Sequence, residues 1–223
     1  MSTHKVSETG IYKPFYGYTA VSMVDDAENR LKDIEDFLTT SVISNYYAPL
    51  PHYTYHMTTF NVYPLVREPL PAVKRWLDQR GETKVDHKQF LPENVLKSQH
   101  RLAIKAIEDH IGFRNLTIRN VILTVGTVIK LNVELEPEDD LSVQSLRKRL
   151  AEIYEYPDEG LKYHITLAYL YKHLPETGSE LSTFEEDISK LRGMTEVFKN
   201  YKLNKHDVYL FDSMINFIPY KDA

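Results

Sequence analysis

Hydrophobic and polar residues alternate along several short segments of the chain, and a period of two residues predicts β-strands. The clearest case lies in 128–135, where Ile129, Leu131, Val133 and Leu135 alternate with Lys130, Asn132 and Glu134. The segment 116–125 is expected to pair with it through a turn that contains Gly126. Further strands are expected at 15–23 and 208–218.

Apolar residues at helical spacing predict helices between these strands. The first helix, capped by Asp25 or Asp26, has one apolar face made of Ala27, Leu31, Ile34 and Leu38. A second, capped by Asp139 or Asp140, has a similar face made of Val143, Leu146, Leu150 and Ile153. Three more helices are expected at 69–80, 92–111 and 179–198, and Gly112 is a typical stop for the middle one.

Both halves of the chain show the same order of strand, helix and a second strand that contains a histidine. This repeat predicts two lobes of like topology related by a pseudo-two-fold axis. We therefore expect an α+β protein in which 1–223 forms a single bilobal domain, each lobe having an antiparallel sheet and outer helices. Lobe one would comprise 12–112 and a final strand, 206–218, that closes its sheet, and lobe two would comprise 113–200.

The two histidine strands carry the same short motif, His56-Met57-Thr58 in one half and His164-Ile165-Thr166 in the other. Among nine histidines, about one His-x-Thr match is expected by chance, so a single copy has no weight. Two copies at equivalent places are informative. Period-2 spacing puts each histidine and its threonine on one face of a strand.

Two imidazoles and two hydroxyls suit chemistry at phosphorus. In-line displacement needs one group that takes a proton and another, on the far side, that gives one, and imidazole serves both roles near neutral pH. The hydroxyls of Thr58 and Thr166 would donate to non-bridging phosphate oxygens. If the lobes face each other, His56 and His164 come to opposite walls of a cleft.

Each motif also has simpler interpretations. A single histidine on a strand is more often a structural residue than a catalyst, and threonine is a common strand residue. Two histidines could instead bind zinc, but neither motif has a carboxylate at ligand spacing and the chain has no cysteine. The symmetrical pair favours a metal-free phosphate site, and no cofactor is expected.

The composition of the chain excludes several classes of protein. The absence of cysteine among 223 residues excludes disulfides and thiol nucleophiles, and the formal charge of −5 argues against binding long duplex nucleic acid. A nucleotide or short RNA remains compatible. The N-terminus lacks the apolar region of a signal peptide and no stretch is long enough to span a membrane. We expect a cytoplasmic monomer that contacts no membrane.

Aromatic residues are abundant around the first motif, and the chain contains 16 tyrosines. Most are expected to be structural. Phe60 is the exception, because in an ideal strand it shares the face of His56 and could stack on a nucleobase.

These motifs resemble those of the two-histidine (2H) phosphoesterase superfamily, and most closely a poorly characterised branch, a domain-of-unknown-function family of bacteria and fungi. The similar blocks are Leu50-Pro51 ahead of Tyr55-His56-Met57-Thr58, His164-Ile165-Thr166-Leu167-Ala168-Tyr169-Leu170, and the opening Phe15-Tyr16-Gly17-Tyr18-Thr19.

The resemblance implies a bilobal fold with an active cleft and metal-independent cleavage of a phosphodiester next to a ribose hydroxyl. Relatives open 2′,3′-cyclic phosphates, cleave 2′-5′ oligoadenylates, trim RNA ends or degrade cyclic nucleotide signals. By this similarity, His56 and His164 are the acid–base pair and Thr58 and Thr166 bind phosphate. Thr59 departs from the pattern, because a large hydrophobic residue is usual there.

Two alternatives to an enzyme of this kind remain. The chain could be a catalytically silent nucleotide-binding module, although intact motifs in both halves argue against a mere sensor. It could also be an RNA-processing subunit that depends on a partner for its substrate. The pseudo-symmetry leaves open which histidine is the acid and which is the base.

Overall fold

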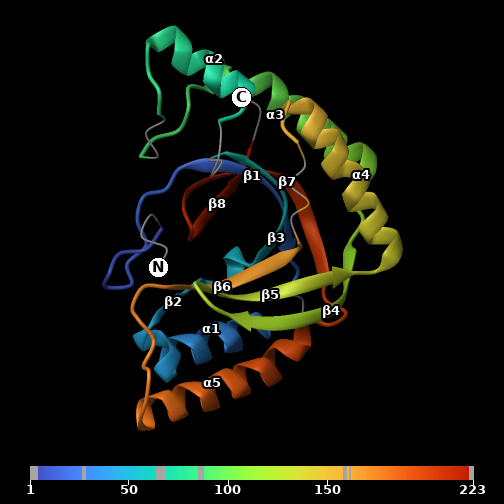
Figure 1. Ribbon diagram of the computed structural model, residues 1–223. Coiled ribbons are helices and arrows are strands. Elements are labelled where there is room, and N and C mark those ends of the chain that lie inside the picture. Colours follow the sequence, from blue (N-terminus) through green and yellow to red (C-terminus); the bar gives the residue numbers. More distant parts are fainter. Residues whose placement is uncertain are drawn as a thin grey trace.

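The computed structural model describes residues 5–26, 29–63, 69–84, 88–157, 160 and 162–220. Within them, an antiparallel sheet is covered on its outside by helices (Figure 1). The strands are β1 (Gly17–Val24), β2 (Tyr47–Pro49), β3 (His56–Tyr63), β4 (Leu116–Val125), β5 (Val128–Leu135), β6 (His164–Leu170), β7 (Lys202–Ser213) and β8 (Asn216–Pro219). The helices are α1 (Leu31–Thr40), α2 (Pro71–Arg80), α3 (Lys97–His110), α4 (Pro137–Ile153) and α5 (Ser179–Thr195).

The sheet closes on itself. Its strands follow the order β1-β3-β6-β5-β4-β7, and β7 pairs back with β1. The ring consists of two groups, β7-β1-β3 and β4-β5-β6, which meet through the pair Met57 and Ile165 on one side and the pairs of Leu116 and Thr117 with β7 on the other. The α+β class is confirmed, and the two-fold relation between the groups stays a prediction.

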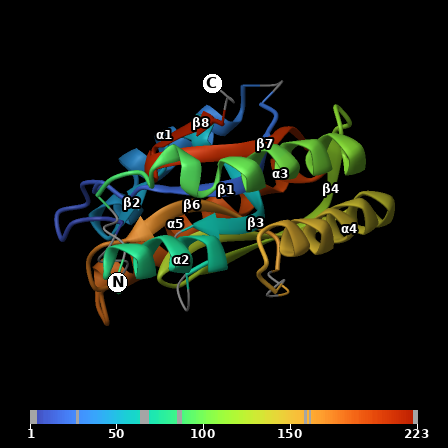
Figure 2. The same ribbon diagram turned by 90° about the horizontal axis from the view of Figure 1, so that it is seen from above.

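The helices pack in pairs that join the two halves of the chain. Helix α1 contacts α5, and both lie beneath β4 and β5 in Figure 1, whereas α3 contacts α4 beside β7 and β3. Figure 2 shows α3 and α4 running side by side along one flank. Each pair consists of one helix from each half of the chain, so the helices do not separate into two lobes along the sequence. The lobe boundaries at 12–112 and 113–200 therefore also stay predictions.

The buried faces of α1 and α4 consist of the residues that the helical spacing predicts, but several helices begin at other residues than expected. Leu31, Ile34 and Leu38 are buried on α1, and Asp26 Oδ1 accepts the N–H groups of Arg30 and Leu31 at 2.8 and 3.1 Å. Ala27 lies outside the described residues. The N-cap residue is Arg30 rather than the predicted Asp25 or Asp26, although the carboxylate of Asp26 accepts N–H groups at the helix start.

Helix α4 begins before the predicted caps, because Pro137 occupies the first turn, where a missing N–H costs nothing. The carboxylate of Asp139 instead accepts the N–H of Thr117 at 2.7 Å. Helix α3 begins five residues later than predicted, since a single 3₁₀ turn, Glu93–Val95, follows Pro92. Similarly, α2 begins at Pro71, and α5 ends before a 3₁₀ turn over Glu196–Phe198.

The expected final strand, 208–218, is a hairpin rather than one strand. Strand β7 begins earlier, at Lys202, and β8 folds back on it after the turn at Met214. Strand β7 pairs with β1 of the first half and also with β4 of the second half, so its assignment to the sheet of the first lobe stays a prediction.

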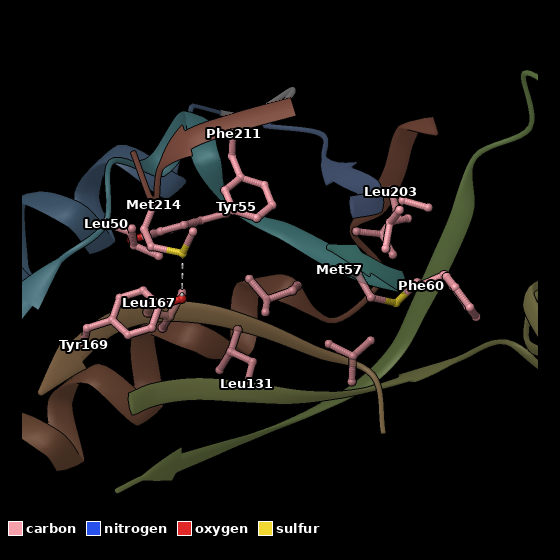
Figure 3. Close-up of a cluster of buried hydrophobic side chains, with 14 of the residues drawn as sticks. Leu50, Tyr55, Met57, Phe60, Leu131, Leu167, Tyr169, Leu203, Phe211 and Met214 are labelled. Atoms are coloured by element: carbon pink, nitrogen blue, oxygen red, sulfur yellow. Dashed lines mark hydrogen bonds between the residues drawn. The ribbon is translucent and has the colours of Figure 1, made fainter. Parts of the chain in front are cut away.

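The core is a continuous cluster of apolar side chains, part of which is drawn in Figure 3. Tyr169 of β6 donates a hydrogen bond to Met214 Sδ at 3.4 Å, which ties β6 to the β7–β8 turn (Figure 3). None of the helices in the described part of the chain is long and apolar enough to cross a membrane.

Candidate active site

The two motifs lie on neighbouring strands, β3 and β6, which pair through Met57 and Ile165. Both of these side chains are fully buried. In an antiparallel pair the residues that flank such a pair point to the opposite face, so the register sets His56 opposite Thr166 and Thr58 opposite His164. The sequence predicted opposite walls of a cleft. The structure instead brings the four side chains together on one face of adjacent strands.

Each motif is followed by a β-bulge at the same position. Val21 of β1 pairs with Thr58 and the preceding residue, Ala20, pairs with Phe60, which leaves Thr59 as the extra residue. In β6, Leu167 is extra in the same way, opposite the step between Ile129 and Lys130. A bulge reverses the alternation of side chains along its strand. Thr59 and Leu167 are both buried, so the smaller residue still fills the equivalent place in the core.

The prediction that Phe60 shares the face of His56 is wrong, and the bulge is the reason. Phe60 is only 4% exposed and stacks on Tyr154, with ring centroids 5.8 Å apart and planes at 16°. It belongs to the buried cluster of Figure 3 together with Met57. Phe60 is therefore a core residue and is not placed to stack on a nucleobase.

The imidazoles are held in matching orientations. His56 Nδ1 lies 2.7 Å from the carbonyl oxygen of Thr54, and His164 Nδ1 lies 3.2 Å from that of Lys162. A carbonyl only accepts hydrogen bonds, so each Nδ1 carries the proton and donates it. In the neutral ring Nε2 then holds the lone pair, which is the tautomer that a general base requires.

The surroundings keep both rings neutral. The pKa of His56 is lowered to about 4, mainly by burial; the hydrogen bond to Thr54 opposes this shift, and His164 and Lys5 contribute to it. Burial also lowers the pKa of His164, and Lys130 and Lys5 act in the same direction. Since the unfolded pKa is near 6.5, the unfolded chain binds more protons between pH 6.5 and about 4, and His56 reduces the stability of the fold as the pH falls through that range.

The sequence is similar to a described protein family and to a viral protein. Residues 5–76 match the model of a family described as 2H-phosphodiest, a domain of unknown function (DUF1868). The chain is also 38% identical over 222 residues to "Uncharacterized protein 127L" of Invertebrate iridescent virus 6, a match that covers 97% of this chain and 94% of the viral protein. The chain belongs to the same family as this viral protein.

A solved structure shows the same fold. It is a conserved protein of unknown function, ATU0111, from Agrobacterium tumefaciens, with a TM-score of 0.63 and 20% identity. The match covers 97% of this chain and 89% of the bacterial one.

Four side chains near the motifs of this two-histidine protein were not singled out by the sequence. Lys130 and Asn132 of β5 lie opposite Thr166 and His164, on the face away from the core. The alternation along β5 already placed them there, but gave no reason to link them to a site. Phe217 of β8 has its ring centroid 4.6 Å from that of His56. Neither Phe217 nor Lys5 carried any signal in the sequence, since both come from hairpins far from the motifs.

Other histidines of the chain have structural contacts. His52 Nδ1 lies 2.6 Å from Glu35, His100 Nδ1 lies 2.9 Å from the Tyr154 hydroxyl, and His206 Nδ1 lies 2.6 Å from the Ser22 hydroxyl. Among the residues that the structure describes, no group of three or more His, Asp or Glu side chains is arranged to hold a metal ion.

The low pKa of His56 predicts how an anion binds to this two-histidine site. A bound dianion favours the imidazolium, so it raises the histidine pKa and binding takes up a proton. The affinity for sulfate, whose own charge stays constant, should rise by roughly tenfold as the pH falls from 7 to about 5. Calorimetry measures this. The rise should be smaller in His56→Asn, and equal affinity at both pH values would contradict the assignment.

Proposed function

We propose that the protein is a metal-independent phosphodiesterase that cleaves a phosphodiester next to a ribose hydroxyl. Its substrate would be a cyclic nucleotide, a 2′-5′ oligonucleotide or an RNA end with a 2′,3′-cyclic phosphate. His56 and His164 are the acid–base pair, and Thr58 and Thr166 bind the phosphate. The match of residues 5–76 to the family described as 2H-phosphodiest supports this activity.

One observation carries the proposal: the register of β3 and β6 gives each histidine the threonine of the other motif as its neighbour. A phosphate held by both threonine hydroxyls then has an imidazole on either side. One Nε2 takes the proton of the attacking water as its oxygen bonds to phosphorus, and the other ring, charged, protonates the leaving oxygen as the P–O bond breaks. The threonine hydroxyls donate to the non-bridging oxygens, where charge increases.

The two rings start in the same state, although the reaction needs one base and one acid. Both are neutral in the empty site at pH 7, so the acid must gain its proton when the anionic substrate binds. One ring serves as the base and the other as the acid. That assignment depends on how the substrate is oriented.

The test is turnover of a panel of 2′,3′-cyclic nucleotides, cyclic dinucleotides and 2′-5′ oligoadenylates in buffer containing EDTA. Cleavage of any of them without metal supports the proposal. A folded protein that binds a nucleotide and leaves it intact would instead be a binding module. A chain that cleaves RNA ends only after a partner is added would be a partner-dependent processing subunit.

A nucleobase would stack on Phe217 rather than on Phe60. Phe217 is partly buried, contacts the His56 ring and packs against Phe211 at a centroid distance of 5.5 Å. Phe217→Ala should raise KM for a purine 2′,3′-cyclic nucleotide about tenfold, because one stacking contact contributes about 1–3 kcal/mol.

The matched substrate is ribose 2,3-cyclic phosphate, which has no base, and its KM should not change in Phe217→Ala. Phe113→Ala is the control variant, since Phe113 is fully exposed and lies on the segment after α3. An equal rise in KM for both substrates would mean that Phe217 acts by positioning His56 and not by stacking.

A further inference from the structure

The N-terminal segment folds as a small hairpin, 5–13. Val6 forms a bridge with Tyr12, and the N–H of Lys13 donates to the carbonyl of Lys5 at 2.9 Å. The turn contains Gly10 with φ of +80°, a conformation that favours glycine. Val6 is buried in the core and the Tyr12 hydroxyl donates to the Ala48 carbonyl at 2.8 Å. The hairpin is thus fixed against the strand pair β2–β6.

This hairpin holds the side chain of Lys5 over aromatic rings of the site face. Lys5 Nζ donates to the Tyr169 hydroxyl at 3.3 Å and lies 5.0 Å from the centroid of that ring and 5.5 Å from that of Phe15. Tyr169 follows the bulge at Leu167, so it points to the same side of β6 as Thr166. In the described part of the chain, no carboxylate lies within ion-pair distance of Lys5.

Lys5 lies close enough to the two imidazoles for its charge to act on both. Its positive charge acts on both rings and lowers the pKa of His56 and of His164. Lys130, opposite Thr166, adds a second positive charge next to His164. A partly buried ammonium whose neighbours are a hydroxyl and two ring faces keeps its charge uncompensated. Such a group attracts an anion.

We infer that Lys5 is an anion-binding residue of the two-histidine site and contacts the phosphate group of the substrate. The role in catalysis rests on the proposed function, whereas the binding of an anion does not. The ammonium donates hydrogen bonds to non-bridging oxygens and exchanges no proton with them. It stabilises the charge that increases on these oxygens during displacement, together with the hydroxyls of Thr58 and Thr166.

Three variants test this role. Lys5→Gln removes the charge, Lys5→Arg keeps it, and Lys13→Gln removes the same charge from an exposed position on the same hairpin. Sulfate is the probe, and calorimetry at low ionic strength measures its affinity. Lys5→Gln should bind sulfate at least about tenfold more weakly, Lys5→Arg within about threefold of the wild type, and Lys13→Gln as the wild type does.

A second measurement separates a charge effect from a structural one. Titration followed by NMR should show a higher pKa for both His56 and His164 in Lys5→Gln, since a nearby positive charge has gone, and no change in Lys13→Gln. If Lys5→Gln does not fold, Lys5→Met keeps the apolar stem against Phe15 and replaces it in both measurements.

The results distinguish this inference from the proposed function. Unchanged sulfate affinity and unchanged histidine pKa values in a folded Lys5→Gln overturn the role of Lys5, whatever the wild type cleaves. Weaker sulfate binding in Lys5→Gln, with no turnover by the wild type, keeps Lys5 as an anion ligand and counts against the phosphodiesterase. Where the wild type is active, Lys5→Gln should lower kcat/KM by about tenfold or more.

Discussion

Replacing either His56 or His164 by alanine is expected to lower kcat by about 10³-fold, while the protein stays folded and still binds its substrate. Each variant removes one of the two proton transfers, and a positioned general acid or base contributes about 10²–10⁴-fold. Steady-state turnover of the best substrate from the EDTA panel measures the loss. His173→Ala is the matched control, because His173 is exposed in the loop after β6.

The double variant sharpens this test. Two groups that act in one displacement are not additive, so His56→Ala combined with His164→Ala should lose little more activity than either single variant. A single variant that keeps a tenth of the wild-type kcat would remove that histidine from the acid–base pair. Losses that multiply would mean that the histidines act in separate steps.

Phe60→Ala should reduce the free energy of unfolding by about 3–5 kcal/mol, the usual result of removing a buried aromatic side chain. Phe60 is enclosed in the core and loses its stacking on Tyr154 in this variant. Denaturant unfolding followed by circular dichroism measures the change. This is the largest loss of stability that we expect from a residue inside either motif strand.

Phe60→Leu tests whether Phe60 contributes to substrate binding, and it can be used even if Phe60→Ala does not fold. Leucine fills much of the same space, so we expect a smaller loss of stability and an unchanged KM for purine and base-free substrates. A raised KM for the purine substrate alone would return Phe60 to the substrate-binding surface.

The periodic pattern of the chain predicted the two motif strands and most of the longer helices and strands, although not all of their bounds. The alternation along β5 and the apolar faces of α1 and α4 are found where the spacing predicts them. The His-x-Thr repeat correctly led to two related strands. These signals are local, because side chains three or four residues apart on a helix, or two apart on a strand, already share a face.

The failures arise where contacts are distant in the sequence. The bulges at Thr59 and Leu167 depend on the register with β1 and β5, which no local pattern specifies. The bulge at Thr59 is the one that turns Phe60 toward the core. The contributions of Lys5 and Phe217 to the site depend on two hairpins that pack beside the motifs. Both come from tertiary packing, and a single sequence contains no measure of it.

The single residue pair between β3 and β6 couples the stability of the fold to its chemistry. Met57 and Ile165 are buried, so the hydrophobic free energy that encloses them also keeps both imidazoles on a common surface. A slip of one residue would turn one motif inward. Local opening at this junction therefore inactivates a molecule whose remaining sheet is intact, and activity reports on a smaller cooperative unit than global unfolding does.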